Sequence, residues 1–183
     1  QYVKPFVKRN KTDAADAEAI CEAVARPNMR FVPIKTKQQQ AILALHRVRS
    51  LLVRQRTATI NALRGLLGEY GIIAGKGVRQ LATLSERLAS AGETVVPSEA
   101  QQALRCLFQH IEALSEKLQD MEMRIVTWHK TDQVSQRLAS APGVGPITAS
   151  AIVAAVGDGK QFKSSRHFAA WLGLTPRIKA SGG

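Results

Sequence analysis

The clearest hydrophobic pattern in the sequence runs through its middle, where apolar residues recur at alternating spacings of three and four. This is a heptad pattern, and it predicts a long helix that buries one seam in a coiled coil. The partner is either a second copy of the chain or an earlier helix folded back, and we favour oligomerisation. A shorter amphipathic helix over Val78–Leu88 and a linker over Gly92–Pro97 come before it. The seam consists of Leu104, Leu107, Ile111, Leu114, Leu118, Met121, Ile125 and Trp128.

A second long helix is predicted from Gln38 to about Glu69, where an imperfect apolar stripe is opposed by a basic side. Basic side chains recur there every seven residues in two adjoining rows, which suits contact with a phosphate backbone. A solvated helix face explains the rows equally well from the sequence alone. One row is Arg47, Arg54 and Asn61, and the other is Arg49 and Arg56.

The start of the chain predicts one more helix, which Thr12 or Asp13 can cap and which runs to about Ala23. Strand-type residues follow from Met29 to Ile34. A single strand cannot be stable without partners, and this chain does not supply any. We therefore expect the missing partners to lie upstream of Gln1.

The end of the chain contains two helical stretches joined by a glycine turn, Pro142-Gly143-Val144-Gly145. Pro146 follows as a residue whose φ is already suited to the first position of a helix. This is a helix-hairpin-helix pattern. Gly143 and Gly145 allow a tight turn and leave backbone N–H groups at a helix N-terminus, where a phosphate oxygen binds well. The alternative is a plain turn between two packed helices.

Charge is unevenly distributed along the chain, whose formal net charge is +12. Residues 1–70 carry 13 Lys/Arg against 5 Asp/Glu, residues 71–135 carry 7 against 8, and residues 136–183 carry 6 against 1. Two basic ends joined by a neutral spacer favour two regions that bind polyanions. A generally basic, solvated surface is the alternative.

Other classes of protein are disfavoured. Cys21 and Cys106 are far apart and outside any metal-binding motif, so we interpret them as reduced residues of a cytosolic protein. The four histidines show no ligand spacing, which argues against zinc. No apolar run is long enough to span a membrane, and we expect no membrane partner.

Asp13 and Asp16 are the candidate metal ligands in the sequence. They are three residues apart on one predicted helical face, where two carboxylates can share a divalent cation. An acidic helix start without any metal is the competing interpretation, because carboxylates stabilise the first turn of a helix. Two carboxylates also make an incomplete Mg²⁺ site.

Three separated blocks of the sequence together resemble one known family. They are KTDAADAEAI with RPNMRFVPIK, then LALHRVRSLLVRQRTATINALRGLLGEYGI, and, after the heptads, PGVGPITASAIVAAVGD with FAAWLGLTPR and SGG. In this order they closely resemble the transposases of insertion sequence family 110, the 110/1111/116/902 group. The resemblance covers nearly the whole chain.

The resemblance implies a mainly α chain in three parts. Residues 1–37 would be the C-terminal remnant of a RuvC-like α/β domain with a DEDD acidic tetrad that binds Mg²⁺. Residues 38–135 would form the long basic helix and coiled coil, and residues 136–183 a truncated, helix-hairpin-helix-like transposase domain that supplies a serine. The chain is then expected to be an internal fragment, inactive alone.

The resemblance also assigns roles to individual residues. Asp13 and Asp16 match the last two acids of the tetrad, and the first two are expected before Gln1. Ser181 matches the serine nucleophile. Arg177 and Lys179 are candidate phosphate clamps, because cations stabilise a phosphoryl transition state.

The expected function is therefore that of a bacterial, cytoplasmic and nucleoid-associated DNA transposase. Its partners would be the DNA of the element ends and target, with other copies of itself through the coiled coil. A structured guide RNA is a candidate partner, since some family members use one. The alternatives are a non-catalytic helix-hairpin-helix nucleic-acid-binding protein and a basic coiled-coil scaffold.

Overall fold

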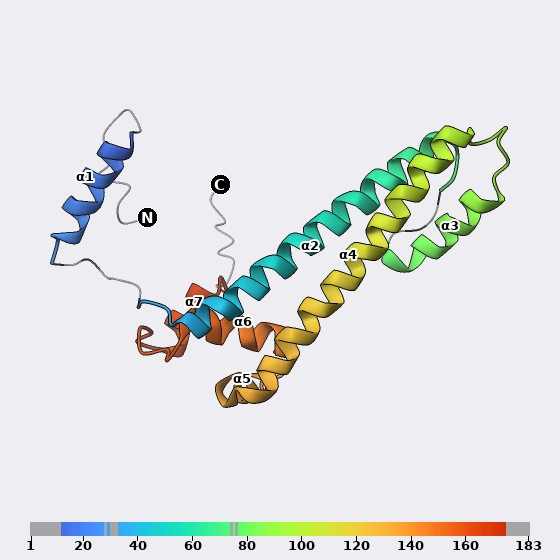
Figure 1. Cartoon of the computed structure of the whole chain (residues 1–183). Helices are drawn as coiled ribbons and strands as arrows, with labels where there is room; N and C mark the ends of the chain where they lie inside the picture. Colours follow the sequence, from blue (N-terminus) through green and yellow to red (C-terminus); the bar gives the residue numbers. More distant parts are fainter. Residues whose placement is uncertain (1–11, 28, 30–32, 74, 76, 175–183) are drawn as a thin grey trace, which may run out of the picture. The chain divides into compact units, whose positions relative to one another are not determined.

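The computed structural model describes residues 12–27, 29, 33–73, 75 and 77–174, and every regular element within them is a helix (Figure 1). The chain divides into two compact units, residues 1–35 and residues 36–183. The mainly α fold expected from the sequence is confirmed.

The helix of the first unit is α1 (Asp13–Val24). Its N-cap is Thr12, whose hydroxyl oxygen accepts a hydrogen bond from Ala15 N at 3.2 Å. This bond satisfies one of the backbone N–H groups that a helix start leaves without a partner. Of the two caps that the sequence allowed, the structure therefore uses Thr12.

The strand predicted at Met29–Ile34 falls largely on residues outside those that the structure describes. Its described members, Met29, Pro33 and Ile34, adopt no regular secondary structure. The RuvC-like remnant to which the strand would belong stays a prediction.

The second unit begins with α2 (Lys37–Glu69), one residue longer at its start than the predicted helix. Thr36 and Gln39 form a reciprocal capping box: Thr36 Oγ1 accepts from Gln39 N at 3.1 Å, and Gln39 Oε1 accepts from Thr36 N at 2.9 Å. Two N–H groups are thereby satisfied at the helix start. At the other end Gly71, with φ +72°, turns the chain away from the helix.

The predicted heptad helix is α4 (Ser98–Thr131), which lies antiparallel beside α2 (Figure 1). No seam residue is exposed. The partner of the seam is α2 of the same chain, which corrects our expectation that the seam itself joins two copies. The hydrophobic effect is satisfied within one chain because α2 also offers an apolar stripe of matching length. The fully buried seam residues are Leu104, Ile111, Leu114, Leu118 and Ile125.

A hydrophobic core closes the end of this helix pair at which α2 stops and α4 begins. The short η2 (Val78–Gln80) leads into α3 (Leu81–Ser90), as the sequence predicts, and α3 buries Leu84 and Leu88 there. Leu63 and Leu67 from α2 are completely buried in the same core. The side chains of Ile60, Ile72, Val96, Leu104 and Ile111 complete it.

Three short helices, α5 (Gln133–Ala139), α6 (Pro146–Val156) and α7 (Ser165–Trp171), lie at the opposite end of the pair. Helix α6 packs on α5, α2 and α4. Gly157, at φ +74°, ends α6 so close to α2 that an added Cβ would lie 2.9 Å from Gln39 Nε2. The positive φ favours glycine, and any larger residue would also require the end of the Gln39 side chain to move.

Candidate functional site

The first element of the candidate site is the acidic start of α1. Asp13 is exposed and Asp16 half-buried, and both lie in the first turn. Because Thr12 is the cap, the carboxylate of Asp13 is not needed to satisfy the helix start. The two carboxylates lie three residues apart in that turn, and a cation shared between them stays a prediction. Within the described part of the chain, no three His, Cys, Asp or Glu side chains gather into a metal-binding group.

The second element is the glycine turn between α5 and α6. Gly143 has φ +84°, and Val144 N donates to Ala141 O at 3.1 Å to close the turn. Gly145 is the N-cap of α6 and Pro146 its first residue, as expected. Added Cβ atoms at Gly143 and Gly145 would meet nothing within 4 Å, so the backbone of the turn is open to a ligand. The two predicted helices and the glycine turn between them are present, whereas the helix-hairpin-helix motif and a phosphate at the turn stay predictions.

A serine–histidine contact fixes this turn to the long basic helix. Ser150 of α6 is fully buried, and its hydroxyl donates to Pro146 O at 2.7 Å. Its oxygen then accepts from Nε2 of His46 on α2, 3.1 Å away. Burial, with a smaller contribution from the Arg49 charge, lowers the pKa of His46 below its ordinary value. The sequence assigned His46 no role, since nothing in the pattern links residues that lie so far apart along the chain.

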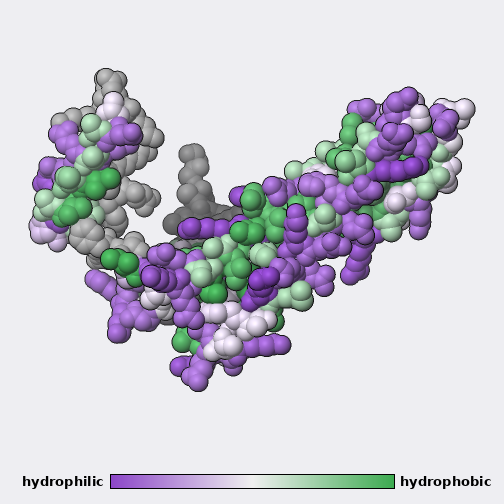
Figure 2. Space-filling model, in the orientation of Figure 1, coloured by the Kyte–Doolittle hydropathy of each residue, from purple (hydrophilic) through white to green (hydrophobic). Residues whose placement is uncertain are grey.

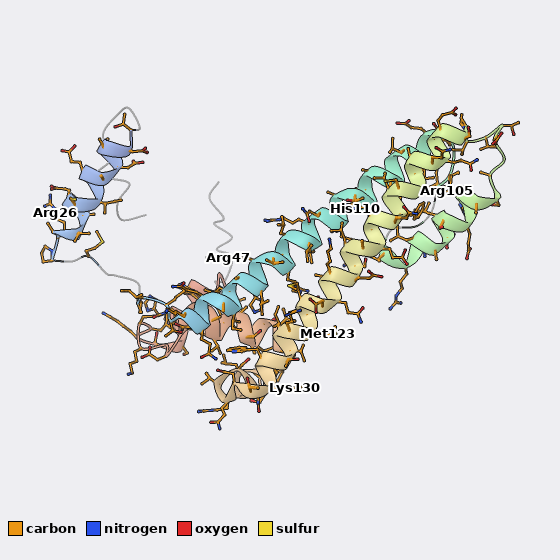
Figure 3. All side chains as sticks on the ribbon, in the orientation of Figure 1. Arg26, Arg47, Arg105, His110, Met123 and Lys130 are labelled. Atoms are coloured by element: carbon orange, nitrogen blue, oxygen red, sulfur yellow. The ribbon has the colours of Figure 1, made fainter. Side chains whose placement is uncertain are left out.

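The third element is the basic side of α2, and the two predicted rows differ in what they contact. Arg47 and Arg54 of the first row are exposed, and Figure 3 labels Arg47 in the first half of the helix. Arg49 of the second row instead binds Glu122 on α4, with N–O distances of 2.7 and 2.8 Å. The prediction of two available rows is therefore corrected for Arg49, whose guanidinium is already paired.

The remaining candidate residues belong to the C-terminal part of the chain, around and after the hairpin. Ser181, Arg177 and Lys179 lie outside the residues that the structure describes, so their predicted roles are untested. The cations that flank the hairpin are exposed, and one of them, Lys160, pairs with Asp158 at 3.3 Å. The other described cations of this group are Arg137, Lys163 and Arg166.

Within the second unit, the hairpin turn and the first arginine row are thus held by one framework of α2, α4 and α6. The acid pair belongs to the other unit. Among the described residues, no helix has the length and apolarity needed to cross a lipid bilayer.

Two family models match the chain, one at each end. A model described as "Transposase", of the DEDD type named for IS110, matches residues 1–72. A model described as "Transposase IS116/IS110/IS902 family" matches residues 135–183. The first contains the acid pair, and the second contains the hairpin and Ser181. No solved structure matches the chain.

Curated relatives cover the full chain. A "Probable family 20 transposase" of Pseudomonas aeruginosa is 47% identical over 184 residues, covering 100% of this chain and 54% of the relative. The transposase for insertion sequence element IS1328 of Yersinia enterocolitica is 44% identical, covering 100% and 54%. That for IS1111A of Coxiella burnetii is 43% identical, covering 100% and 50%. The chain therefore spans about half the length of these relatives.

Proposed function

This chain belongs to the IS116/IS110/IS902 family of transposases, and from that membership we propose that it is part of a recombinase that cuts and rejoins DNA at the ends of an insertion sequence. The observation that supports this most directly is the pair of family models, which match in order a segment with two acids and a segment with a serine. The chain spans about half of its relatives, so the activity is proposed for the longer protein.

Asp13 and Asp16 are proposed to bind Mg²⁺. Their two carboxylates lie in one helical turn, and Mg²⁺ is commonly held by one or two carboxylates together with substrate phosphates. The other acids of a DEDD set are expected outside this chain. The bound ion would supply positive charge that stabilises a phosphoryl transition state. The family comparison supports a divalent metal, and the choice of Mg²⁺ rests on this chemistry.

Ser181 is proposed as the nucleophile. Its hydroxyl oxygen would form an ester bond with the scissile phosphorus, while the bond from that phosphorus to one deoxyribose oxygen breaks and the departing oxygen takes up a proton. The resulting phosphoserine link keeps the energy of the phosphodiester for rejoining. Arg177 and Lys179 are proposed to neutralise charge on the phosphate.

Phosphate contacts are proposed at two places on the second unit. Arg47 and Arg54 extend into solvent from one side of α2, and Gly143 and Gly145 expose a turn of bare backbone. The His46–Ser150 contact holds these two places in a fixed relation. Together they can follow a nucleic acid over a longer path than either could alone.

A structured RNA is proposed as a second nucleic-acid ligand that selects the DNA sites. If base pairing reads the sequence, the protein needs to recognise only backbone and shape. The motifs of this chain fit a protein that recognises the nucleic-acid backbone, because its basic row and its hairpin are both proposed to bind phosphates. Such a complex would associate with the bacterial nucleoid.

Assembly of several copies is also part of the proposal, through a different surface from the one first expected. Since the seam of α4 is filled by α2, the free heptad-spaced stripe is on the outer side of α2, where Val48 is 43% and Leu51 46% exposed. Figure 2 shows apolar side chains along this visible side of α2. The acids and the serine lie in segments matched by different family models, and the proposal is that those which act together come from different copies. The stripe consists of Ala44, Val48, Leu51, Ala58 and Ala62.

The experiment that tests this function uses the protein at its full natural length with Mg²⁺, element-end DNA and RNA transcribed from the noncoding flank of the element. We expect a protein–DNA adduct that survives denaturing electrophoresis. The adduct should disappear in Ser181→Ala and persist in Ser165→Ala, a matched change at an exposed serine of the same domain. Omitting the RNA tests the guide separately.

The acid pair is tested in the same assay. Asp13→Asn with Asp16→Asn should abolish the adduct, whereas Glu18→Gln, at another exposed acid of α1, should leave it intact. An adduct that survives the double change would exclude a metal role for the pair. Tight binding of DNA without any adduct in the wild-type protein would favour the non-catalytic nucleic-acid-binding protein.

A further inference from the structure

One side of α2 carries a continuous row of polar side chains that extends beyond the two proposed phosphate contacts. Its members follow at spacings of 3-4-3-4-3, which keeps them on one side of the helix. None of them is acidic, and Glu69 at the far end is the sole acid of α2. All are exposed except the last, which is half-buried. The members of this polar row are Arg47, Ser50, Arg54, Thr57, Asn61 and Arg64.

The polar row ends in a pocket of about 300 Å³ where α2 meets the start of η2. Its floor is Ile60, which is 8% exposed, and Val78 forms a wall that is 49% exposed. Polar groups of the row lie around these apolar surfaces. The described residues that line the Asn61 pocket, as we call it, are Thr57, Ile60, Asn61, Arg64, Gly77 and Val78.

The polar side chains of the Asn61 pocket differ in whether they already form hydrogen bonds within the protein. Arg64 Nη1 donates to Gly75 O at 2.6 Å, which holds the segment before η2 against α2. Thr57 Oγ1 donates to Val53 O at 2.8 Å, and its lone pairs stay able to accept. Among the described residues, none hydrogen-bonds the side-chain amide of Asn61. Its donor and acceptor are therefore both available to a ligand.

This combination fits a single nucleotide. The apolar floor and wall can cover the face of a nucleobase, and the Asn61 amide can form the paired donor and acceptor contacts that read a base edge. The volume is at the low end for small-molecule sites, which suits one nucleotide and excludes a stacked base pair. Arg54 lies about 10 Å from Asn61 along the helix axis, within reach of a neighbouring phosphate.

We propose that the Asn61 pocket binds an unpaired nucleotide of a nucleic acid whose backbone follows the polar row of α2. This inference rests on the proposed function, because it takes the arginines of the row to contact phosphates. It adds a site that discriminates unpaired from paired nucleotides. In a duplex the base edges and faces are stacked and cannot enter the pocket, so the site selects a bulge, a loop or an opened strand.

The test measures binding of the 183-residue chain to fluorescently labelled RNA hairpins by anisotropy. One hairpin contains a single bulged adenosine, and its partner is the same hairpin without the bulge. Asn61→Leu should weaken binding of the bulged hairpin about tenfold, since a good base contact is worth roughly 1–3 kcal/mol. It should change binding of the unbulged hairpin less than about twofold, because phosphate contacts are kept. The same pair made of DNA shows which nucleic acid supplies the nucleotide.

The matched control is Gln38→Leu, which replaces another exposed amide of α2 by leucine outside the pocket. It should leave both affinities unchanged. Thermal unfolding of both variants checks that α2 is intact, which is expected because both positions are exposed. Arg54→Gln tests the underlying phosphate contacts: it should weaken both hairpins and reduce the slope of log affinity against log salt by about one.

The outcomes separate the two proposals. If Arg54→Gln weakens both hairpins and Asn61→Leu does not distinguish them, the nucleotide pocket is refuted and the phosphate contacts stand. If the chain binds neither hairpin in a salt-dependent way, the phosphate contacts are refuted, and the pocket proposal fails with them. A selective loss on the bulged RNA or the bulged DNA alone supports the pocket and identifies its ligand.

Discussion

At the scale of single residues, the His46–Ser150 contact joins α2 to α6 through two side chains that the sequence gives no reason to connect. The contact places a titratable group where its charged form is poorly solvated. Burial is the main reason that the pKa of His46 is lowered, and the nearby Arg49 guanidinium adds to it. Protonation of His46 therefore opposes the folded state.

The stability of the chain should accordingly fall as the pH is lowered. Above the ordinary value of about 6.5 the imidazole is neutral in both states. Below it the unfolded state binds the proton more readily than the folded state, so the free energy of unfolding decreases. His46→Gln should flatten this part of the pH profile, measured by urea unfolding between about pH 8 and 5.

Ser150→Ala provides the control for this prediction. It removes the hydrogen-bond partner but leaves His46 packed at the same place, so the pH dependence should persist. A flat profile in Ser150→Ala, with the slope retained in His46→Gln, would show that the effect originates elsewhere.

At the scale of elements, α4 shows how a heptad pattern is satisfied within one chain. Leu118 is 4% exposed at the seam, whereas Met123 on the same helix is 55% exposed. Leu118→Ala should lower the free energy of unfolding by about 2–5 kcal/mol, because a methyl-lined cavity replaces packed side chains. Met123→Ala should change it by less than about 0.5 kcal/mol.

Urea unfolding followed by far-UV circular dichroism measures both changes. Equal effects of the two substitutions would contradict the packing of α4 on α2. The pair tests the seam directly, because the two changes remove comparable apolar volume from positions that differ in burial.

At the scale of the whole molecule, the free stripe on α2 predicts how copies associate. Sedimentation velocity at micromolar concentration should show an oligomer for the wild-type chain. Leu51→Glu should yield monomers, because a carboxylate would be buried in the interface without a partner. Met123→Glu, which places the same charge on an exposed position of α4, should leave the oligomer intact. A monomeric wild-type chain would overturn the proposed interface.

The helices could be predicted well because their signals are local. The Thr12 cap, Pro146 and the glycines at positions 71 and 143 all act within one or two turns of the backbone. The acid pair and the hairpin glycines could be found for the same reason. Their spacing along the chain already determines which side of a helix or turn they occupy.

What the sequence determined by itself is therefore the presence of α1 to α6, the side of α2 that carries cations and, through resemblance, the family. Tertiary structure alone decided that α2 packs against the seam of α4. It also decided that Arg49 forms an ion pair with Glu122 and that Asn61 borders a pocket. The physical reason is that a heptad seam specifies the shape of its partner without specifying which chain provides it. Which helix pairs with the seam depends on the total apolar area that is buried when the whole unit folds. The contacts between residues far apart in the sequence then follow from that pairing.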